Sequence, residues 1–220
     1  MTNNFDLFKQ YIQKTYQTSG IDRFGTSFNK DEDTFFSIEI IRRGKDNPNM
    51  PSTNYLFKNY HINSLDDIDK YKQEIIDICD MFNMRAYVSI CRKSYRKCLW
   101  KQNEIIAKRI CDADYKKCYK SWQSAVSQYS SKYDKRWIID IDDKDTDLDF
   151  VKNIINECQP IESNKIVTIF PTKSGYHMIT LPFNKIEFCH KWFNKYGDTK
   201  NVPEIKKNSL TLLYENIRQE

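Results

Sequence analysis

Two aspartates separated by a single residue form the strongest chemical signal in the sequence. Asp140 and Asp142 lie in the run Trp137–Asp143, whose bulky and β-branched residues predict a short strand. Because side chains alternate across a strand, both carboxylates point to one face, and Ile139 and Ile141 point to the other. Two acids one pleat apart fit a hard divalent cation such as Mg²⁺ or Mn²⁺, which takes oxygen ligands. A solvated, Asp-rich turn is the alternative.

A histidine follows at a spacing that brings it back beside the aspartates. Residues 165–170 and 175–181 predict two strands joined by a polar turn, which together form a hairpin. On the second strand, Tyr176 and Met178 take one face and His177 takes the other. If Tyr176 and Met178 pack under helices, His177 lies beside the aspartates and completes a polar site. The alternative is an imidazole that is hydrogen-bonded inside the core.

The elements around these strands alternate regularly. Residues 147–158 and 184–196 have apolar side chains at helical spacing, and residues 209–214 predict a last short strand. Together with strand 137–142 and the hairpin, the order is βαββαβ, that of the ferredoxin-like or RRM-like unit. The helices of such a unit cover one face of the sheet, so the aspartates and His177 are expected on the open face.

Asp140 and Asp142 on an apolar strand, followed by Ser174 and His177 in the segment Thr172–Met178, resemble the first two signatures of the archaeo-eukaryotic primase superfamily, the primase-polymerases. The resemblance implies that the two aspartates are catalytic and bind Mg²⁺ or Mn²⁺. It implies that the serine and the histidine hold the phosphates of a nucleoside triphosphate. It also implies a single-stranded nucleic acid as template and a part in DNA replication.

The third signature of that family, an acid on the final strand, is not evident. The expected final strand and the residues just before it, 206–214, contain no carboxylate. The nearby substitutes are Glu204, Glu215 and the neutral Asn208. In a nucleotidyl transfer, Lys173 or Lys206 would neutralise the charge that develops during in-line attack by a 3′-hydroxyl.

Three classes of function remain open. The first is a primase-polymerase-like nucleotidyltransferase. The second is a catalytically inactive protein on the same scaffold that binds a nucleotide or a nucleic acid, and the absent third acid favours it. The third is a phosphatase of the haloacid-dehalogenase type, suggested by Asp140 and Asp142. That class requires a parallel sheet, and a threonine or valine where Lys144 stands.

Residues 92–120 are strongly basic, with ten lysines and arginines against three acids, and five aromatic side chains lie between positions 95 and 122. Cations that neutralise phosphates, together with aromatics that stack on bases, are typical of a nucleic-acid groove. An amphipathic helical pair with core aromatics and solvated lysines explains the same pattern. The candidate nucleic-acid contacts are Arg92, Lys93, Arg96, Lys97 and Lys101.

The N-terminal half predicts a mixed α/β module that ends in this basic helical segment. Helices are expected at 5–16 and 65–82, the second capped by Ser64, and strands at 35–41, 54–62 and 85–90. A loop with Pro48 and Pro51 and flanking basic residues is placed to lie over a ligand. We therefore expect an α+β protein, with this module in residues 1–130 and the RRM-like module in residues 131–220, packed as one unit.

Composition bounds the protein class. With 220 residues, of which 40% are hydrophobic and 14% aromatic, the chain is long enough for a core and is not a disordered polymer. No stretch approaches the roughly twenty apolar residues that span a bilayer, and the first residues lack the apolar run of a signal peptide. We therefore expect a cytoplasmic protein without a membrane partner.

Seven cysteines, an odd number, fit reduced thiols in that compartment. Cys91, Cys98, Cys111 and Cys118 form two pairs whose members are separated by six residues. Zinc ligands within a pair are usually separated by about two to four residues. Small side chains on one helix face explain the wider spacing equally well.

Overall fold

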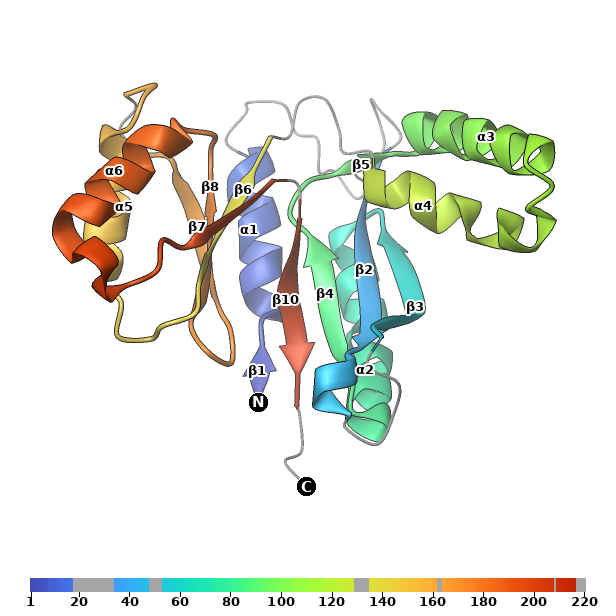
Figure 1. Ribbon diagram of the computed structural model, residues 1–220. Coiled ribbons are helices and arrows are strands. Elements are labelled where there is room, and N and C mark those ends of the chain that lie inside the picture. Colours follow the sequence, from blue (N-terminus) through green and yellow to red (C-terminus); the bar gives the residue numbers. More distant parts are fainter. Residues whose placement is uncertain (18–33, 48–52, 129–134, 162–163, 208, 217–220) are drawn as a thin grey trace.

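The computed structural model describes residues 1–17, 34–47, 53–128, 135–161, 164–207 and 209–216, which form an α+β protein with two antiparallel sheets. Figure 1 shows the two sheets side by side with helix α1 between them. This confirms the expected class, and most helices and strands expected from the sequence lie within a residue or two of their observed bounds. The predicted loop with Pro48 and Pro51 lies outside the described residues.

The first sheet is built mostly from the N-terminal half. Its strand order is β1-β10-β4-β2-β3, and a short strand, β5, also pairs with β2. The strands are β1 (Thr2–Asn3), β2 (Thr34–Arg42), β3 (Tyr55–Ile62), β4 (Arg85–Ser89), β5 (Lys93–Ser94) and β10 (Leu210–Glu215), and the short helix η1 (Gly44–Asp46) follows β2. Helices α1 (Phe5–Gln17) and α2 (Leu65–Phe82) cover one of its faces.

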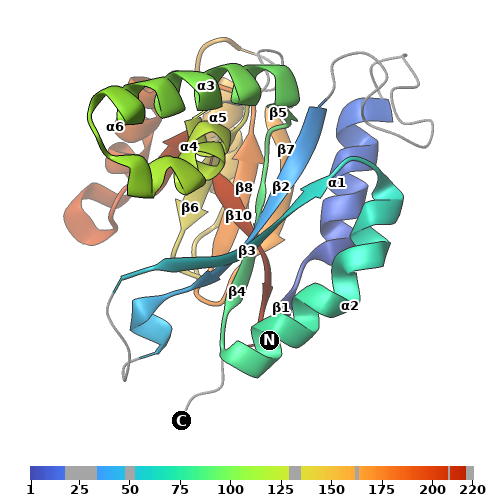
Figure 2. The same cartoon turned by 90° about the vertical axis from the view of Figure 1, so that its right-hand side faces the viewer.

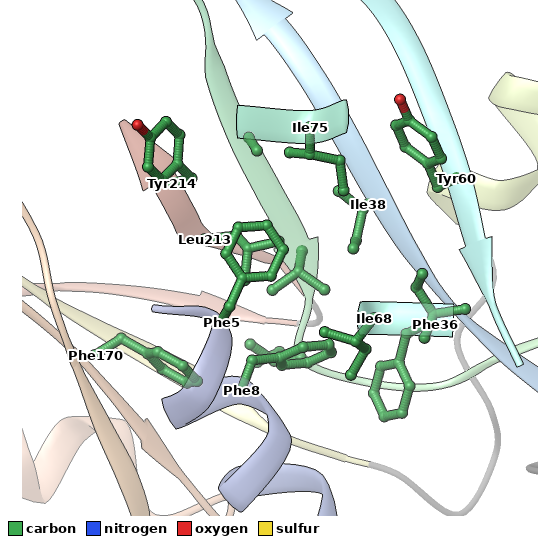
Figure 3. Packing of buried hydrophobic residues seen from close by; sticks show 14 of the residues in the cluster. Phe5, Phe8, Phe36, Ile38, Tyr60, Ile68, Ile75, Phe170, Leu213 and Tyr214 are labelled. Atoms are coloured by element: carbon green, nitrogen blue, oxygen red, sulfur yellow. The ribbon is translucent and has the colours of Figure 1, made fainter. Parts of the chain in front are cut away.

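The main core lies between this sheet and its two helices. Alternate residues of β2, Phe36, Ile38 and Ile40, are fully buried in the cluster that also contains Phe5 and Phe8 of α1. Figure 3 shows Phe36 and Ile38 together with these two rings. Full burial of such a side chain contributes about 2 kcal/mol. The alternation of buried apolar side chains that predicts β2 therefore also determines which face of the first sheet the two helices cover.

The second sheet contains the aspartate strand. Its order is β7-β8-β6-β9, and all three pairings are antiparallel. The strands are β6 (Trp137–Ile141), β7 (Ile166–Pro171), β8 (Tyr176–Thr180) and β9 (Glu204–Lys207), and the helices are α5 (Leu148–Glu157) and α6 (Lys185–Tyr196), followed by the short helix η3 (Gly197–Thr199). Ile139, Met178 and Ile205 pack under the two long helices, on Val151 and Trp192.

A buried lysine closes the end of α5. Lys165 is fully buried, and its ammonium donates to the carbonyl oxygens of Ile155, Asn156 and Cys158 at 2.8, 2.8 and 2.6 Å. An ammonium group has three donors and no acceptor, so all its hydrogen bonds are made. The charge also lies at the helix end where the macrodipole favours a cation. Lys165 thereby fixes α5 to the start of β7.

One element of the expected βαββαβ order is wrong. Residues 209–214 do form a strand, β10, but it lies in the first sheet between β1 and β4. The edge position beside β6 is taken by β9. Five of the six residues of β10 are buried, which suits an interior strand, whereas only Ile205 of β9 is buried. An edge strand tolerates such a polar sequence.

The face of the second sheet that carries Asp140 is open only in part. Ile138, Phe170 and Ile179 on that face are fully buried and join the main core beneath α1. The two sheets therefore share one core. The expected open face begins at Asp140, because there the first sheet no longer covers the second.

A helical hairpin projects from the other side of the first sheet. It consists of α3 (Tyr95–Cys111), the short helix η2 (Tyr115–Lys120) and α4 (Ser121–Gln128), and residues 95–128 are called the arm below. Figure 2 shows the arm and the pair α1 and α2 on opposite sides of β2 and β3. Phe35, on the face of β2 away from the main core, packs against Cys98 and Val126 of the arm.

Among the described residues, none of the helices has both the length and the apolar character that a bilayer crossing requires.

Candidate functional site

Asp140 has an ionisable neighbour on each side. In the antiparallel register it lies directly opposite His177 on β8 and directly opposite Glu204 on β9. Directly opposed residues project to the same face of a sheet, with Cβ atoms about 5 Å apart. The structure therefore brings Asp140 and His177 together, as the alternation along the strands predicts, and adds a glutamate to them.

Short polar contacts connect these side chains. The Nε2 atom of His177 lies 3.2 Å from Oδ1 of Asp140, and its Nδ1 atom lies 2.9 Å from the hydroxyl oxygen of Thr211. The ammonium of Lys206 donates to Oδ2 of Asp140 and lies 3.4 Å from Glu204. Asp140 thus has a histidine on one oxygen and a lysine on the other.

These contacts determine the charge state of the carboxylate. The hydrogen bond from His177, followed by that from Lys206, lowers the pKa of Asp140 to about 2. Burial is the largest single influence on the Lys206 ammonium and lowers its pKa, but the hydrogen bond to Asp140 and the charges of Asp140 and Glu204 together outweigh burial and raise the pKa of Lys206. At neutral pH the centre is therefore an ionised carboxylate beside an ammonium.

The geometry also assigns the imidazole proton. An ionised carboxylate can only accept, so Nε2 of His177 carries a hydrogen that it donates to Asp140. In the neutral ring Nδ1 then accepts from the hydroxyl of Thr211. Thr211 lies on β10. The strand that was expected to complete the second sheet therefore lies in the first sheet, and from there it contacts His177.

Glycine is required where the β7–β8 turn meets β6. The turn closes through a hydrogen bond of 2.9 Å from Thr172 N to Gly175 O and one of 3.0 Å from Gly175 N to the Thr172 hydroxyl. A Cβ atom at Gly175 would lie 1.8 Å from the carbonyl oxygen of Ile141. Only glycine permits this approach. The glycine thus sets the distance between the turn and Asp142.

A cleft of about 730 Å³ opens in front of these groups, between the two sheets. From the second sheet it is lined by all six residues expected at the site. These are Asp140, Asp142, Lys173, Ser174, His177 and Lys206. Lys173 and Ser174 are exposed on the turn before β8. Of the aspartate pair, Asp140 is held by contacts within the protein, whereas Asp142 is exposed and has no ion pair among the described residues.

The opposite wall of the cleft carries residues that the predicted site did not include. Arg43, Lys45 and Tyr87 line it, and the Arg43 guanidinium donates to the Tyr87 hydroxyl at 3.3 Å. The sequence signal was the basic cluster that closes the strand at 35–41. Glu204 also lines the cleft, as a residue that the sequence left as one of several substitutes.

A buried ion network fixes that wall. Arg85 binds Asp46 through two hydrogen bonds of 2.7 and 2.8 Å and lies 2.9 Å from Glu215. The three side chains are 10%, 9% and 3% exposed, so the charges compensate one another away from water. Because Asp46 ends η1, the network orders the segment that carries Arg43 and Lys45.

Among the described residues, no group of three or more His, Cys, Asp and Glu side chains could hold a metal ion. The carboxylates at the cleft nevertheless suit Mg²⁺, which is usually held by one or two carboxylates together with substrate phosphates. The described carboxylates at the cleft therefore do not form a site for a permanently bound ion, and a cation could bind there only if a second molecule supplied further ligands.

No protein-family model, curated protein or solved structure matches this chain. The function of the site is therefore inferred from its geometry.

The expected basic surface is corrected at two residues. Arg92 and Lys93 are each only 4% exposed, because the chain at β5 pairs with the start of β2. Burial lowers the pKa of Lys93 and raises that of nearby Glu39. Arg92 and Lys93 therefore lie inside the protein at β5 and are not part of a basic surface. The other three candidates, Arg96, Lys97 and Lys101, lie on the arm.

None of the seven cysteines, all of which are among the described residues, forms a disulfide. Cys91 and Cys98 are buried, Cys118 is half-buried and Cys111 is exposed. The first pair of that spacing therefore consists of buried side chains, but only Cys98 lies on a helix, because Cys91 lies between β4 and β5.

Proposed function

We propose that this protein is a primase-polymerase-like nucleotidyltransferase that joins NTPs or dNTPs on a nucleic-acid template with the help of a divalent metal. The observation that carries the proposal is the row of His177, Asp140 and Glu204 across three neighbouring strands at the edge of a cleft. Lys173 and Ser174 line the same cleft. Acids beside phosphate-binding donors are what in-line phosphoryl chemistry requires.

The arrangement of the second sheet supports this proposal. The chain order is β6-α5-β7-β8-α6-β9, and β6 and β8, the first and third of these strands, are central in the sheet, as the proposed RRM-like unit requires. Asp140 lies on β6, the first strand of that unit, Asp142 follows directly after β6, and His177 lies on β8, the third strand. These are the positions that the resemblance to primase-polymerases implies.

The position of Glu204 supports the proposal as a candidate for the third acid. The resemblance requires an acid on the final strand of the unit, and β9, rather than β10, occupies that position. Glu204 begins β9 and lies opposite Asp140. It is the most exposed member of the cluster, 71% at its side chain, and is therefore accessible to a ligand in the cleft.

Asp140, Asp142 and Glu204 would contribute ligands to Mg²⁺ or Mn²⁺ together with the phosphates of the substrate. When bound, such an ion supplies a Lewis acid that activates the attacking hydroxyl and stabilises charge on the phosphates.

The chain's own residues supply the remaining functions. Lys173 and the hydroxyl of Ser174 bind phosphate oxygens from the turn, and Arg43 and Lys45 do so from the opposite wall. Lys206 leaves the ion pair with Asp140 and neutralises charge on the phosphates. His177 donates through Nε2 and orients either Asp140 or a phosphate oxygen.

A specific observation favours the inactive binding protein as second candidate. Both oxygens of Asp140 already have partners, one of which is the cation Lys206. A site that compensates its own carboxylate has less need of a metal. The haloacid-dehalogenase alternative is excluded, because the sheet that carries Asp140 is antiparallel in every described pairing.

The experiment is incorporation of labelled NTP or dNTP on a primed single-stranded template with Mn²⁺. Wild type is compared with Asp140→Asn, Asp142→Asn and the matched control Asp149→Asn, an acid that lies on α5 outside the cleft. Incorporation by wild type and the control, lost in both cleft variants, supports the proposal. Equal signals in all four proteins would remove it.

Metal binding without turnover separates the two candidates. Lys206→Met removes the cation that competes for Asp140, so we expect tighter Mn²⁺ binding by calorimetry in the absence of nucleotide. In wild type, Mn²⁺ binding should require nucleotide. Nucleotide binding that is indifferent to Mn²⁺ in both proteins would select the inactive binding protein.

A further inference from the structure

The positive charge of the whole protein is concentrated on the arm. Residues 95–128 contain eight lysines and arginines and three acids, whereas the full chain contains 35 basic and 30 acidic residues. The arm's excess of five charges therefore equals the net charge of +5 of the entire chain, and the remainder is neutral. The arm is therefore the part of the protein that would attract a polyanion most strongly.

Most of the arm's cations lack an acidic partner. Glu104 pairs with Lys101 at 2.6 Å and Asp114 pairs with Lys117 at 2.8 Å, both within the arm. Within the described ranges, no carboxylate lies at ion-pair distance from the rest of the arm's lysines, and all of these except the half-buried Lys97 are exposed. These lysines are Lys97, Lys108, Lys116 and Lys120.

The aromatic side chains of the arm fall into two groups. Tyr95 and Trp122 are half-buried and anchor the arm, since the Trp122 indole donates to Nε2 of His61 at 3.3 Å and the Tyr95 ring lies 4.2 Å from that of Phe35. Trp100, Tyr115 and Tyr119 instead point to solvent, with exposures of 73%, 65% and 77%.

These three are the most exposed aromatic side chains among the described residues, and all three lie on the most basic part of the chain. Rings that project into solvent are accessible to a ligand. Bases of a single strand stack on such rings, whereas bases of a duplex are already stacked on each other. A protein partner that packs on these apolar rings would also have to bury the lysines near them in the sequence, which have no acidic partner among the described residues.

We propose that the arm binds single-stranded nucleic acid without sequence preference, with Trp100 and Tyr119 as stacking platforms and Lys116 and Lys120 on the phosphates. The template strand as occupant rests on the proposed function, which this inference deepens. The arm is a separate surface from the cleft, so strand binding and nucleotide chemistry can be tested independently.

The test is fluorescence anisotropy of a labelled oligo-dT of about 20 nucleotides, longer than a typical single-strand site. Trp100→Ala/Tyr119→Ala should raise the dissociation constant about tenfold or more, since each stacked base is worth a factor of about 5 to 100. The matched control, Phe193→Ala on α6, removes a ring that is 53% exposed outside the arm and should leave the dissociation constant within about twofold.

A second pair of variants tests the charges. Lys116→Gln/Lys120→Gln should weaken binding, and Lys70→Gln/Lys185→Gln, at exposed lysines outside the arm, should not. A duplex of the same length should bind more weakly than the single strand. Unchanged affinity in both arm variants, equal losses in the controls, or a duplex that binds as tightly as the single strand would overturn the proposal.

The oligomeric state provides a further decisive outcome. If Trp100→Ala/Tyr119→Ala converts a dimer to a monomer in sedimentation while oligo-dT binding is unchanged, the rings join two copies of the chain and the proposal is wrong. Asp140→Asn should bind oligo-dT like wild type. Failure of nucleotidyl transfer therefore does not decide whether the arm binds a single strand. Failure of strand binding in the arm variants likewise does not decide whether the cleft carries out nucleotidyl transfer.

Discussion

In the cleft, cations and anions meet at close range, whereas on the arm most cations face solvent. Asp140 is bound by His177 and Lys206, and Arg85 is bound by two buried acids. On the arm, Lys116 and Lys120 have no acidic partner among the described residues. Both regions are polar, but only one is preorganised.

The two proposals assign a different kind of ligand to each region. A compensated cluster with fixed geometry binds a small ligand that can replace particular contacts, since each group is already oriented. Uncompensated lysines on long side chains bind a polyanion of variable shape, and their attraction depends on salt. The following experiments sharpen or break this contrast.

The largest effect is expected for the third acid. Glu204→Gln keeps the size of the side chain and removes its charge from the position opposite Asp140. Nucleotidyl transfer should fall about 100-fold or more, the usual loss for removal of a group that stabilises the transition state. Asp145→Asn, in the polar turn after β6, should leave the rate within about twofold. A Glu204→Gln rate equal to that of this control would show that Glu204 has no part in the chemistry.

Salt should separate the arm from the cleft. Single-strand affinity falls with a slope of about −0.7 per phosphate contact in a double-logarithmic plot, so five contacts mean a loss of about 100-fold between about 50 and 200 mM salt. Lys116→Gln/Lys120→Gln should make the measured slope shallower by about 1.4. A slope that these substitutions leave unchanged contradicts the assignment of phosphate contacts to the arm.

The glycine at the turn should be intolerant of any side chain. Gly175→Ala places a methyl group against a backbone carbonyl that no side-chain rotation can relieve. We expect a loss of about 3 kcal/mol in unfolding free energy, at the upper end for overpacking. Urea denaturation measures the loss, and Gly197→Ala, where a Cβ would meet no atom within 4 Å, distinguishes the clash from a general effect of losing glycine. Because Gly197 has a φ of +53°, its own cost should be about 1 kcal/mol.

The smallest effect concerns pH. Since the folded-state pKa of Asp140 is about 2 rather than the ordinary 3.8, the folded protein gains stability above about pH 4 and loses it as the pH falls toward 2. The shift corresponds to about 2 kcal/mol. Asp140→Asn should remove this part of the pH dependence in acid unfolding curves. An unchanged curve would show that the His177 and Lys206 contacts do not hold the carboxylate.

The site was predictable where local pattern and packing agree. The alternation of Ile139, Asp140 and Ile141 decides which side chains the core takes, and the same rule on β8 brings His177 to the acids. The capping box of Ser64 with Asp67 and the cap of α5 by Asp147 follow from local hydrogen bonds in the same way.

What the sequence could not indicate depends on long-range pairing. Strand β9 is short and polar, and its only buried side chain is Ile205, so the stronger apolar run of β10 was taken for the last strand of the unit. Glu204, the first residue of β9, was therefore named only as one of several nearby substitutes for the third acid. Burial of Arg92 and Lys93 has the same origin, because counting charges along the chain cannot show that β5 pairs with β2.

The most direct test follows the histidine rings in the presence of a paramagnetic ion. The protein has three histidines, His61, His177 and His190, and NMR resolves their ring signals. With Mn²⁺ and nucleotide together, the signals of His177 should broaden selectively, because the proposal places the ion on Asp140, its neighbour. Selective broadening of His61 or His190, or none at any ring while nucleotide is bound, would contradict a metal-assisted nucleotide site at the end of β6.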